Sequence, residues 1–242
     1  MYREIAPPAD LADHVACVWT SVSRGGVIFP DGCVDIVWRG DALVVAGPAT
    51  RPLEAGVPVG MPVFGVRFRV GAAGAALGLP AEELLDEGSV PLAELWGPDC
   101  EERVAAGGVA ALVEVVREHL VAPLDPLARA AALDLARPGA RVADLALSLG
   151  LSERQLRRRF LDAVGYGPKT LARVLRFQRF LALARGGDDL ARLAFAAGYA
   201  DQAHLTRECR RLSGRTPAEL IASGAGAAGE RLPHGFPSEL RR

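Results

Sequence analysis

A helix–glycine–helix pattern occurs twice in the C-terminal third of this 242-residue chain. Residues 142–160 are VADLALSLGLSERQLRRRF, and residues 190–209 are LARLAFAAGYADQAHLTREC. In each copy an apolar-periodic segment reaches a glycine, Gly150 or Gly198, and a second segment then presents Leu-x-Arg. Because glycine readily adopts the positive φ that a sharp helix exit needs, the pattern predicts two helix-turn-helix units.

The first copy carries local signals for a stable second helix over residues 152–163. Ser152 can cap the first turn, and Gln155 three residues later completes a capping box. Leu156 and Phe160 are four residues apart, so they lie on one face of the helix. We expect that face to pack on the preceding helix and to hold the unit together.

The remaining face of this helix is basic. Four of the ten residues from 151 to 160 are arginines, and three of them point away from the expected core: Arg154, Arg157 and Arg158. The N-terminal half of the second helix enters the major groove in such units, where arginine pairs with guanine or with phosphate. For a single helix, a solvated face with an ordinary Glu153–Arg157 pair is the alternative, and the second copy argues against it.

Charge is distributed unevenly along a chain whose net charge is only −1. Residues 137–221 hold 15 Arg, one Lys and eight acidic residues, a net of +8, whereas residues 1–136 hold nine Arg and 19 acidic residues, a net of −10. This asymmetry favours double-stranded DNA as the partner of the basic part. The four cysteines are scattered, and neither a long apolar run nor a signal peptide is apparent, so we expect a cytoplasmic protein with reduced thiols.

The pattern of segments predicts an α+β N-terminal domain rich in antiparallel strands, followed by an all-α domain with two helix-turn-helix units joined by a long helix. Short β-branched or aromatic runs bounded by turn residues predict strands at VIFP, CVDIVW, ALVVAG and VFGVRFRV. A short helix is expected over 79–87. The expected parts are a mixed α/β effector-sensing domain (1–88), a helical linker or dimerisation segment (89–136), a DNA-binding domain (137–221) and a flexible tail (222–242).

The C-terminal segment resembles the AraC family of bacterial transcription regulators over about residues 137–221. GYGPKTLARVLRFQRFLALA (165–184) resembles the central segment of the family, and AFAAGYADQAHLTRECRRLSGRTPAEL resembles its signature end. The matching positions in that end include Gly198, Tyr199, Leu205, Arg207, Gly214, Thr216, Pro217 and Leu220. The resemblance implies seven helices and two helix-turn-helix units that insert into adjacent major grooves.

Carried over residue by residue, the resemblance implies two sets of DNA-binding side chains. The first recognition helix contributes Arg154, Arg157 and Arg158, and the second contributes Gln202, Ala203, His204, Thr206 and Arg207. Two positions depart from the family pattern: Cys209 stands where Phe is usual, and Ala203 is short for a base-contacting position. RNA polymerase is a further candidate partner, and both a monomer and a homodimer remain open.

The N-terminal half resembles a little-characterised domain found in some AraC-type regulators, through FPDGCVDIVW, VVAGPATRP and VFGVRFRVGAA. The strands of 27–70 offer a mostly apolar interior with few polar groups, which suits a pocket for a small organic effector of unknown identity. The candidate ligand-binding residues are Asp31, Asp35, Arg67 and Trp38.

Catalysis and metal binding have little support in the sequence. Asp31, Cys33 and Asp35 alternate around a strand start, and ordinary turn and core roles are favoured over a polar patch or a metal site, because no histidine lies nearby. We expect no enzyme activity, no metal and no cofactor. Two alternatives stay open: a DNA-alkylation repair sensor that uses a reactive Cys17 or Cys33, and a ligand-free architectural or interaction module.

Overall fold

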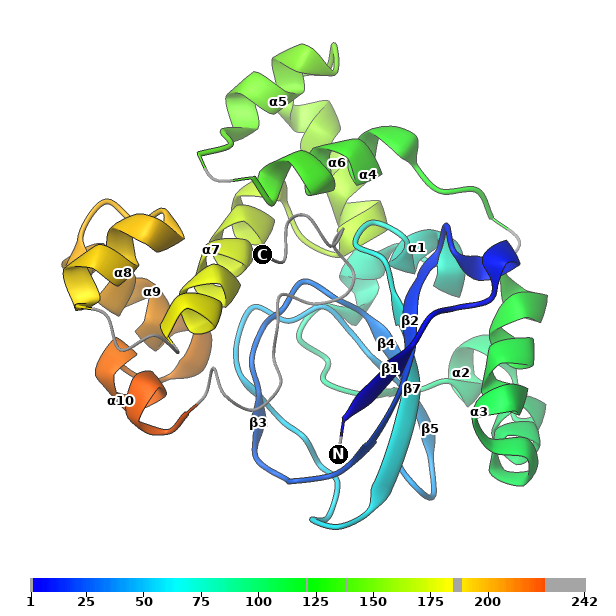
Figure 1. Ribbon diagram of the computed structural model, residues 1–242. Coiled ribbons are helices and arrows are strands. Elements are labelled where there is room, and N and C mark those ends of the chain that lie inside the picture. The colour runs from blue at the N-terminus through cyan, green and yellow to red at the C-terminus, as the bar shows by residue number, and fades with distance from the viewer. Residues whose placement is uncertain (1, 121, 138, 185–188, 225–242) are drawn as a thin grey trace.

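The N-terminal half is built on a six-stranded antiparallel sheet with the strand order β1-β2-β7-β4-β5-β8 (Figure 1). The computed structural model describes residues 2–120, 122–137, 139–184 and 189–224, so the expected tail lies outside it from residue 225 onward. The strands of the sheet are β1 (Arg3–Ile5), β2 (Val15–Val22), β4 (Asp35–Trp38), β5 (Leu43–Ala46), β7 (Pro62–Phe68) and β8 (Val90–Pro91). A second, two-stranded sheet pairs β3 (Val27–Ile28) with β6 (Leu53–Glu54).

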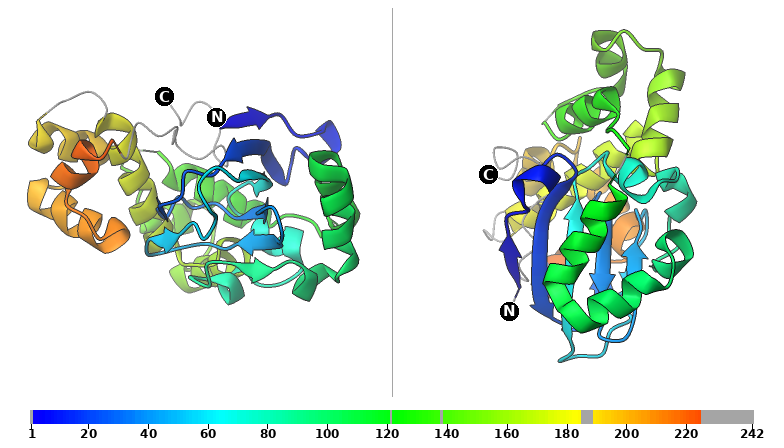
Figure 2. Two further views of the ribbon diagram at one scale, coloured as in Figure 1. Left: turned by 90° about the horizontal axis from the view of Figure 1, so that it is seen from below. Right: turned by 90° about the vertical axis from the view of Figure 1, so that its right-hand side faces the viewer.

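Helices cover one face of the six-stranded sheet, and the right-hand view of Figure 2 shows α3 in front of it. They are the 3-10 turns η1 (Ala9–Leu11) and η2 (Ala81–Leu84) and the helices α1 (Ala73–Leu77), α2 (Ala93–Trp96) and α3 (Asp99–His119). Ile36, Val66 and Phe68 of the sheet share a core with Leu112 and Val116 of α3. The apolar face of α3, formed by Val109, Leu112, Val113 and Val116, therefore packs in this core of the N-terminal half.

The C-terminal half contains the helices that the sequence predicts. They are α4 (Pro126–Leu135), α5 (Val142–Ser148), α6 (Glu153–Val164), α7 (Pro168–Leu183), α8 (Leu190–Ala197), α9 (Gln202–Ser213) and α10 (Pro217–Ala222). Their common core includes Phe160, Phe177 and Phe180, each of which is fully buried. The predicted fold class, an antiparallel-strand domain followed by helices with two helix-turn-helix units, is confirmed.

Helix α4 packs with this C-terminal core, on α6 and α7. Its alanines at 128, 131 and 132 are fully buried there. Asp125 caps α4 by accepting hydrogen bonds from the backbone N–H groups of Leu127 (2.9 Å) and Ala128 (3.1 Å), and it also pairs with Arg159 of α6. Residues 89–136, expected as one linker segment, thus contribute α2 and α3 to one core and α4 to the other.

The two halves meet along α6, which contacts α1 and η2. The backbones come so close that a Cβ atom at Gly74 of α1 would lie 2.1 Å from the carbonyl oxygen of Asp162. Only a glycine therefore permits this packing. Near the same boundary, Phe29 meets Phe177 of α7 edge to face, with ring centroids 5.9 Å apart.

Several elements of the N-terminal half, among them β2 and η2, differ from the expectation. The longest strand, β2, was not among the predicted strands. The helix expected over 79–87 is the short turn η2, because Leu85 is extended and Asp86 adopts a positive φ of 60°. The Asp86 carboxylate accepts hydrogen bonds from the backbone N–H (2.7 Å) and the hydroxyl (2.6 Å) of Thr50, which hold the chain in this turn.

Candidate nucleic-acid interface and ligand pocket

The first helix-turn-helix unit consists of α5 and α6, joined through Gly150, whose φ is +65°. The predicted capping box is present: the Ser152 hydroxyl accepts a hydrogen bond from Gln155 N (3.2 Å), and Gln155 Oε1 accepts one from Ser152 N (2.9 Å). These bonds satisfy N–H groups that a helix start leaves without partners. The start of α6 is therefore well defined by its own sequence.

The faces of α6 are arranged as the spacing predicts. Leu156 and Phe160 are fully buried, whereas Arg154, Arg157 and Arg158 are exposed. The fourth arginine has a different role, because Arg159 Nη1 lies 2.7 Å from Asp125 Oδ2 and ties α6 to the start of α4. Glu153 pairs with Lys169 at 3.8 Å. The three exposed arginines thus form a basic surface at the N-terminal half of α6.

The second unit consists of α8 and α9, joined through Gly198, whose φ is +91°. Asp201 caps α9 by accepting a hydrogen bond from His204 N at 2.6 Å. The side chains assigned to this recognition helix divide by exposure: exposed are Gln202, Ala203 and Arg207, and partly buried are His204 and Thr206.

His204 and Thr206 already make contacts within the protein. The His204 ring stands edge-on to Tyr199 with centroids 5.2 Å apart, and the Thr206 hydroxyl donates to the carbonyl of Gln202 at 2.9 Å. Cys209, at the position where the family has Phe, is fully buried in the core, and burial raises the pKa of its thiol to about 12. Two of the five side chains assigned to the second unit are therefore partly buried and already bonded or packed within the protein.

A pocket of about 440 Å³ lies on the face of the sheet opposite α3. Its wall combines aromatic and aliphatic side chains with charged ones, among them Glu4, Asp31, Asp35 and Arg67. Asp35, Arg67 and Cys17 are neighbours across β4, β7 and β2, so the strand register itself brings them together. Three of the four residues assigned to ligand binding, Asp31, Asp35 and Arg67, thus line one cavity.

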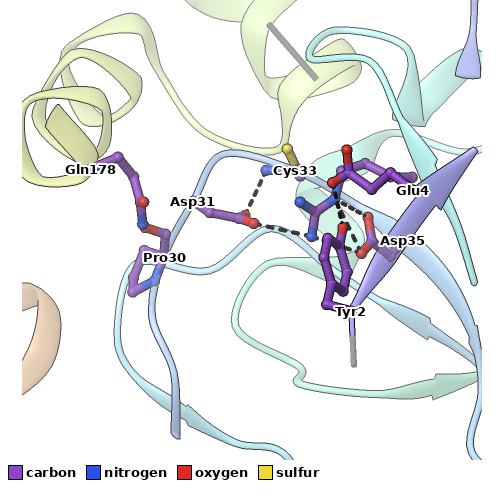
Figure 3. Close-up of polar contacts among 8 residues, drawn as sticks. Tyr2, Glu4, Pro30, Asp31, Cys33, Asp35 and Gln178 are labelled. Carbon is purple, nitrogen blue, oxygen red and sulfur yellow. Dashed lines mark hydrogen bonds and ion pairs between the residues drawn. The ribbon is translucent and has the colours of Figure 1, made fainter. Parts of the chain in front are cut away.

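Arg67 is the centre of the polar part of this pocket. Its Nε and Nη2 donate to the two Asp35 oxygens at 2.9 and 3.0 Å, and Nη2 lies 3.4 Å from Asp31 Oδ2; Figure 3 shows the two carboxylates around it. Burial acts to lower the pKa of Arg67, but the neighbouring Asp35 raises it well above its usual value. Burial raises the pKa of Asp35, whereas the neighbouring Arg67 lowers it less strongly. The guanidinium therefore stays charged in a largely buried site.

Trp38, the fourth residue assigned to ligand binding, does not line this pocket. Side chains alternate between the two faces of a strand, so Asp35 and Val37 face the pocket while Ile36 and Trp38 face the other side. There Trp38 stacks on Phe64 with centroids 6.3 Å apart. The tryptophan that does line the pocket is Trp19 of β2, which lies over Gly65, where a Cβ atom would come within 2.7 Å of the indole.

Several polar residues of the pocket, among them Tyr2, Glu4 and Gln178, were not found from the sequence. Tyr2 and Glu4 come from the edge strand region, and the Tyr2 hydroxyl donates to Glu4 Oε1 at 2.6 Å. Gln178 comes from α7, more than a hundred residues away, and is buried. The C-terminal half of the chain therefore contributes a side chain, Gln178, to the wall of the pocket (Figure 3).

The four cysteines are buried and form no disulfide. Cys33 lines the pocket, and its backbone N–H donates to Asp31 Oδ1 at 2.9 Å. Within the described part of the chain, no three His, Cys, Asp or Glu side chains gather in a way that could hold a metal ion. The described helices also include none that is long and apolar enough to cross a membrane.

Two family models match this chain. Residues 145–223 match a helix-turn-helix domain, and residues 3–89 match a domain of unknown function, DUF6597. The C-terminal part of the chain is therefore a helix-turn-helix domain of the kind found in DNA-binding transcription regulators. Within that class, the C-terminal domain is of the AraC type, as the sequence resemblance implies, and DUF6597 precedes it.

Solved structures give weaker likenesses. The chain is similar to a DNA-binding transcriptional dual regulator from Escherichia coli K-12 (23% identity, 43% of this chain and 96% of that chain, TM-score 0.36). It is also similar to ToxT from Vibrio cholerae O395 (12%, 88% and 97%, TM-score 0.45) and to fatty-acid-bound ToxT from strain SCE256 (12%, 84% and 93%, TM-score 0.42). No curated protein matches the chain significantly.

Proposed function

We propose that this protein binds specific duplex DNA through both helix-turn-helix units and that a small organic effector in the sheet pocket controls this binding. The observation that carries the proposal is physical continuity between pocket and DNA-binding domain: Gln178 of the joining helix α7 forms part of the pocket wall. No catalytic step is assigned to the protein, and all four of its thiols are buried.

The first part of the proposal rests on the basic surface of α6. Arg154, Arg157 and Arg158 are exposed at the half of the helix that enters a major groove in such units. The segment from 137 to 221 carries a net charge of +8, which favours binding to a polyanion. In α9, Gln202 and Arg207 are the exposed side chains that suit base or phosphate contacts.

The second part rests on the chemistry of the pocket. A volume of about 440 Å³ is in the range of sites for small organic molecules, and its mixture of apolar wall and few polar groups is typical of them. Arg67 has donors beyond those used by Asp35, and Glu4 brings a further carboxylate to the wall. An effector with an apolar body and one polar end fits this arrangement.

A short segment, residues 29–33, connects the pocket to α7. On the pocket side, Asp31 lies 3.4 Å from Arg67. On the helix side, Gln178 Nε2 donates to the Pro30 carbonyl at 2.7 Å, and Phe29 packs on Phe177 (Figure 3). A ligand that draws Arg67 or Asp31 into new contacts therefore displaces a segment bonded to the helix that joins the two DNA-binding units.

DNA binding is tested with the full chain, by selecting bound sequences from a random duplex pool and titrating the best one with salt. If the two units make about six phosphate contacts, the logarithm of the DNA-binding constant plotted against the logarithm of the salt concentration has a slope of about −5. A selected motif with such a slope is the expected result. Binding without sequence preference would leave only an architectural role, and absence of binding would refute the proposal.

Effector control is tested by a thermal-shift screen of metabolites, followed by DNA titration with each hit. A true effector raises the melting temperature, because it binds the folded state only, and it changes the affinity for the selected DNA. The variant Gln178→Leu keeps the pocket but lacks the bond to Pro30, so the hit still binds while its effect on DNA affinity falls. Unchanged coupling in that variant would refute the proposed route, and a screen without hits would favour the interaction module.

A further inference from the structure

A second cavity, of about 250 Å³, lies at the junction of the two helix-turn-helix units. Its wall comes from the segment between α4 and α5, from α7 and from the end of α8, whose relative places are visible in Figure 1. Four arginines line it, and among the described residues no Asp or Glu does. They are Arg137, Arg141, Arg176 and Arg179.

Two of these arginines, Arg176 and Arg179, lie on α7. Arg179 donates to the carbonyl oxygens of Ala136 at 2.6 Å and Ala197 at 3.3 Å, which fixes its guanidinium between α4 and α8. The Arg176 guanidinium lies 5.8 Å from the centroid of the Tyr199 ring. Its Nε is buried and has no hydrogen-bond partner, so a donor is left unsatisfied inside the protein.

The positive charge around this cavity is poorly balanced. Burial, followed by the proximity of Arg176, lowers the pKa of Arg179. Asp134 pairs with one of the four, Arg137, at 2.8 Å, and Glu208 pairs with Arg173, outside the cavity wall, at 3.0 Å. Arg176 and Arg141 have no ion-pair partner among the described residues. An anion in the cavity would relieve both the charge and the unsatisfied donor.

We propose that this arginine cavity binds a phosphate group. Guanidinium groups donate several N–H bonds in a fixed plane, a geometry that matches phosphate oxygens, and such charge-assisted bonds are strong. The phosphate belongs either to the DNA backbone or to a small phosphorylated molecule. The site is separate from the sheet pocket, and it shares no residue with the effector proposal.

The first arm of the test uses inorganic phosphate and the full chain without DNA. Calorimetric titration is expected to show binding to the wild type that weakens about tenfold or more in Arg176→Met, since a charged hydrogen-bond donor is lost. Arg141→Gln, at an exposed position of the same cavity, is a second variant that leaves the core intact. Arg211→Gln on α9 removes the same charge at an exposed position outside the cavity and is the control.

The second arm measures DNA binding of the same variants against salt. If the cavity holds a backbone phosphate, Arg176→Met and Arg141→Gln each reduce the salt slope by about one and weaken all DNA sequences alike. Phosphate binding with an unchanged slope assigns the site to a small phosphorylated molecule. Wild-type protein that binds no phosphate, or variants that bind it as well as Arg211→Gln does, would overturn the proposal. A chain that binds phosphate but no DNA would refute only the proposed regulator function.

Discussion

Arg158 and Phe160 of α6 have opposite surroundings, and substitutions should distinguish their roles. Arg158→Ala removes an exposed side chain, so we expect unchanged thermal stability and a loss of about 1–3 kcal/mol in specific DNA binding if the arginine contacts a base. Phe160→Ala empties a fully buried position and should cost about 3–5 kcal/mol of folding free energy. Chemical denaturation and DNA titration measure the two effects. A harmless Arg158→Ala beside a stable Phe160→Ala would reverse the assignment of faces.

Asp125 makes the stability of the chain depend on pH. Burial acts to raise the pKa of this carboxyl, but bonds from Arg159 and from the backbone of Ala128 and Leu127 outweigh it and hold the pKa below its usual value. A lowered folded-state pKa contributes stability above the unfolded value of about 3.9, and the contribution disappears as pH falls through the folded-state pKa.

The matched variant for this effect is Asp125→Asn, which still caps α4 but carries no charge. We expect it to be less stable than the wild type at pH 7 and to approach the wild type as the pH falls below about 4. Denaturant titrations at several pH values measure the difference. A gap between the two proteins that stays constant down to acid pH would show that the Arg159 pair contributes nothing.

The single-residue features of the DNA-binding surface could be predicted from sequence because they are local. Helical spacing alone separates Leu156 and Phe160 from Arg154 and Arg158. The pocket was only partly predictable, since Asp35 and Trp38 were grouped although strand alternation places them on opposite faces. The position of Gln178 in the pocket could not be predicted from the sequence, because it depends on how α7 packs against residues 29–33.

At the scale of elements, a DNA-binding fragment that folds on its own is expected to include helix α4, because α4 packs in the C-terminal core. A fragment of 137–224 lacks the buried alanines of α4 and leaves their contact surface on α6 and α7 exposed. We therefore expect a fragment of 123–224 to be folded and better able to bind DNA, and one of 137–224 to be less stable. Circular dichroism melts of the two fragments, at equal concentration, provide the comparison. Equal melting temperatures would show that α4 adds nothing to the core.

Strand β2 shows why some elements escape detection. Its sequence VACVWTSV has apolar residues on both faces: Val18 faces the helices, and Cys17 and Trp19 face the pocket. Without a clean alternation, the segment lacks the pattern by which half-buried strands are found. Several C-terminal helices, in contrast, carry local end signals: side-chain caps precede α6, α9 and α10, and a glycine of positive φ ends α6, α8 and α9.

At the scale of the whole molecule, the contact between α1 and α6 should respond sharply to one methyl group. Gly74→Ala places a Cβ where the Asp162 carbonyl lies, so one of the two helices must move, at a cost of about 1–3 kcal/mol. We expect a lower melting temperature and separate unfolding of the two halves in calorimetry. Ala75→Ser on the same helix is the control. A single unfolding transition at the wild-type temperature in Gly74→Ala would contradict the tight contact.

The two ends of α6 serve different halves of the protein: its first turns present arginines to solvent, while its last turns lie against α1 and η2. The protein is consequently not a pair of interchangeable modules. A chimera that takes its DNA-binding helices from a related regulator would also need the matching glycine at 74 and the matching turn at η2. Substitutions on the two sides of this contact are therefore expected to occur in pairs between relatives.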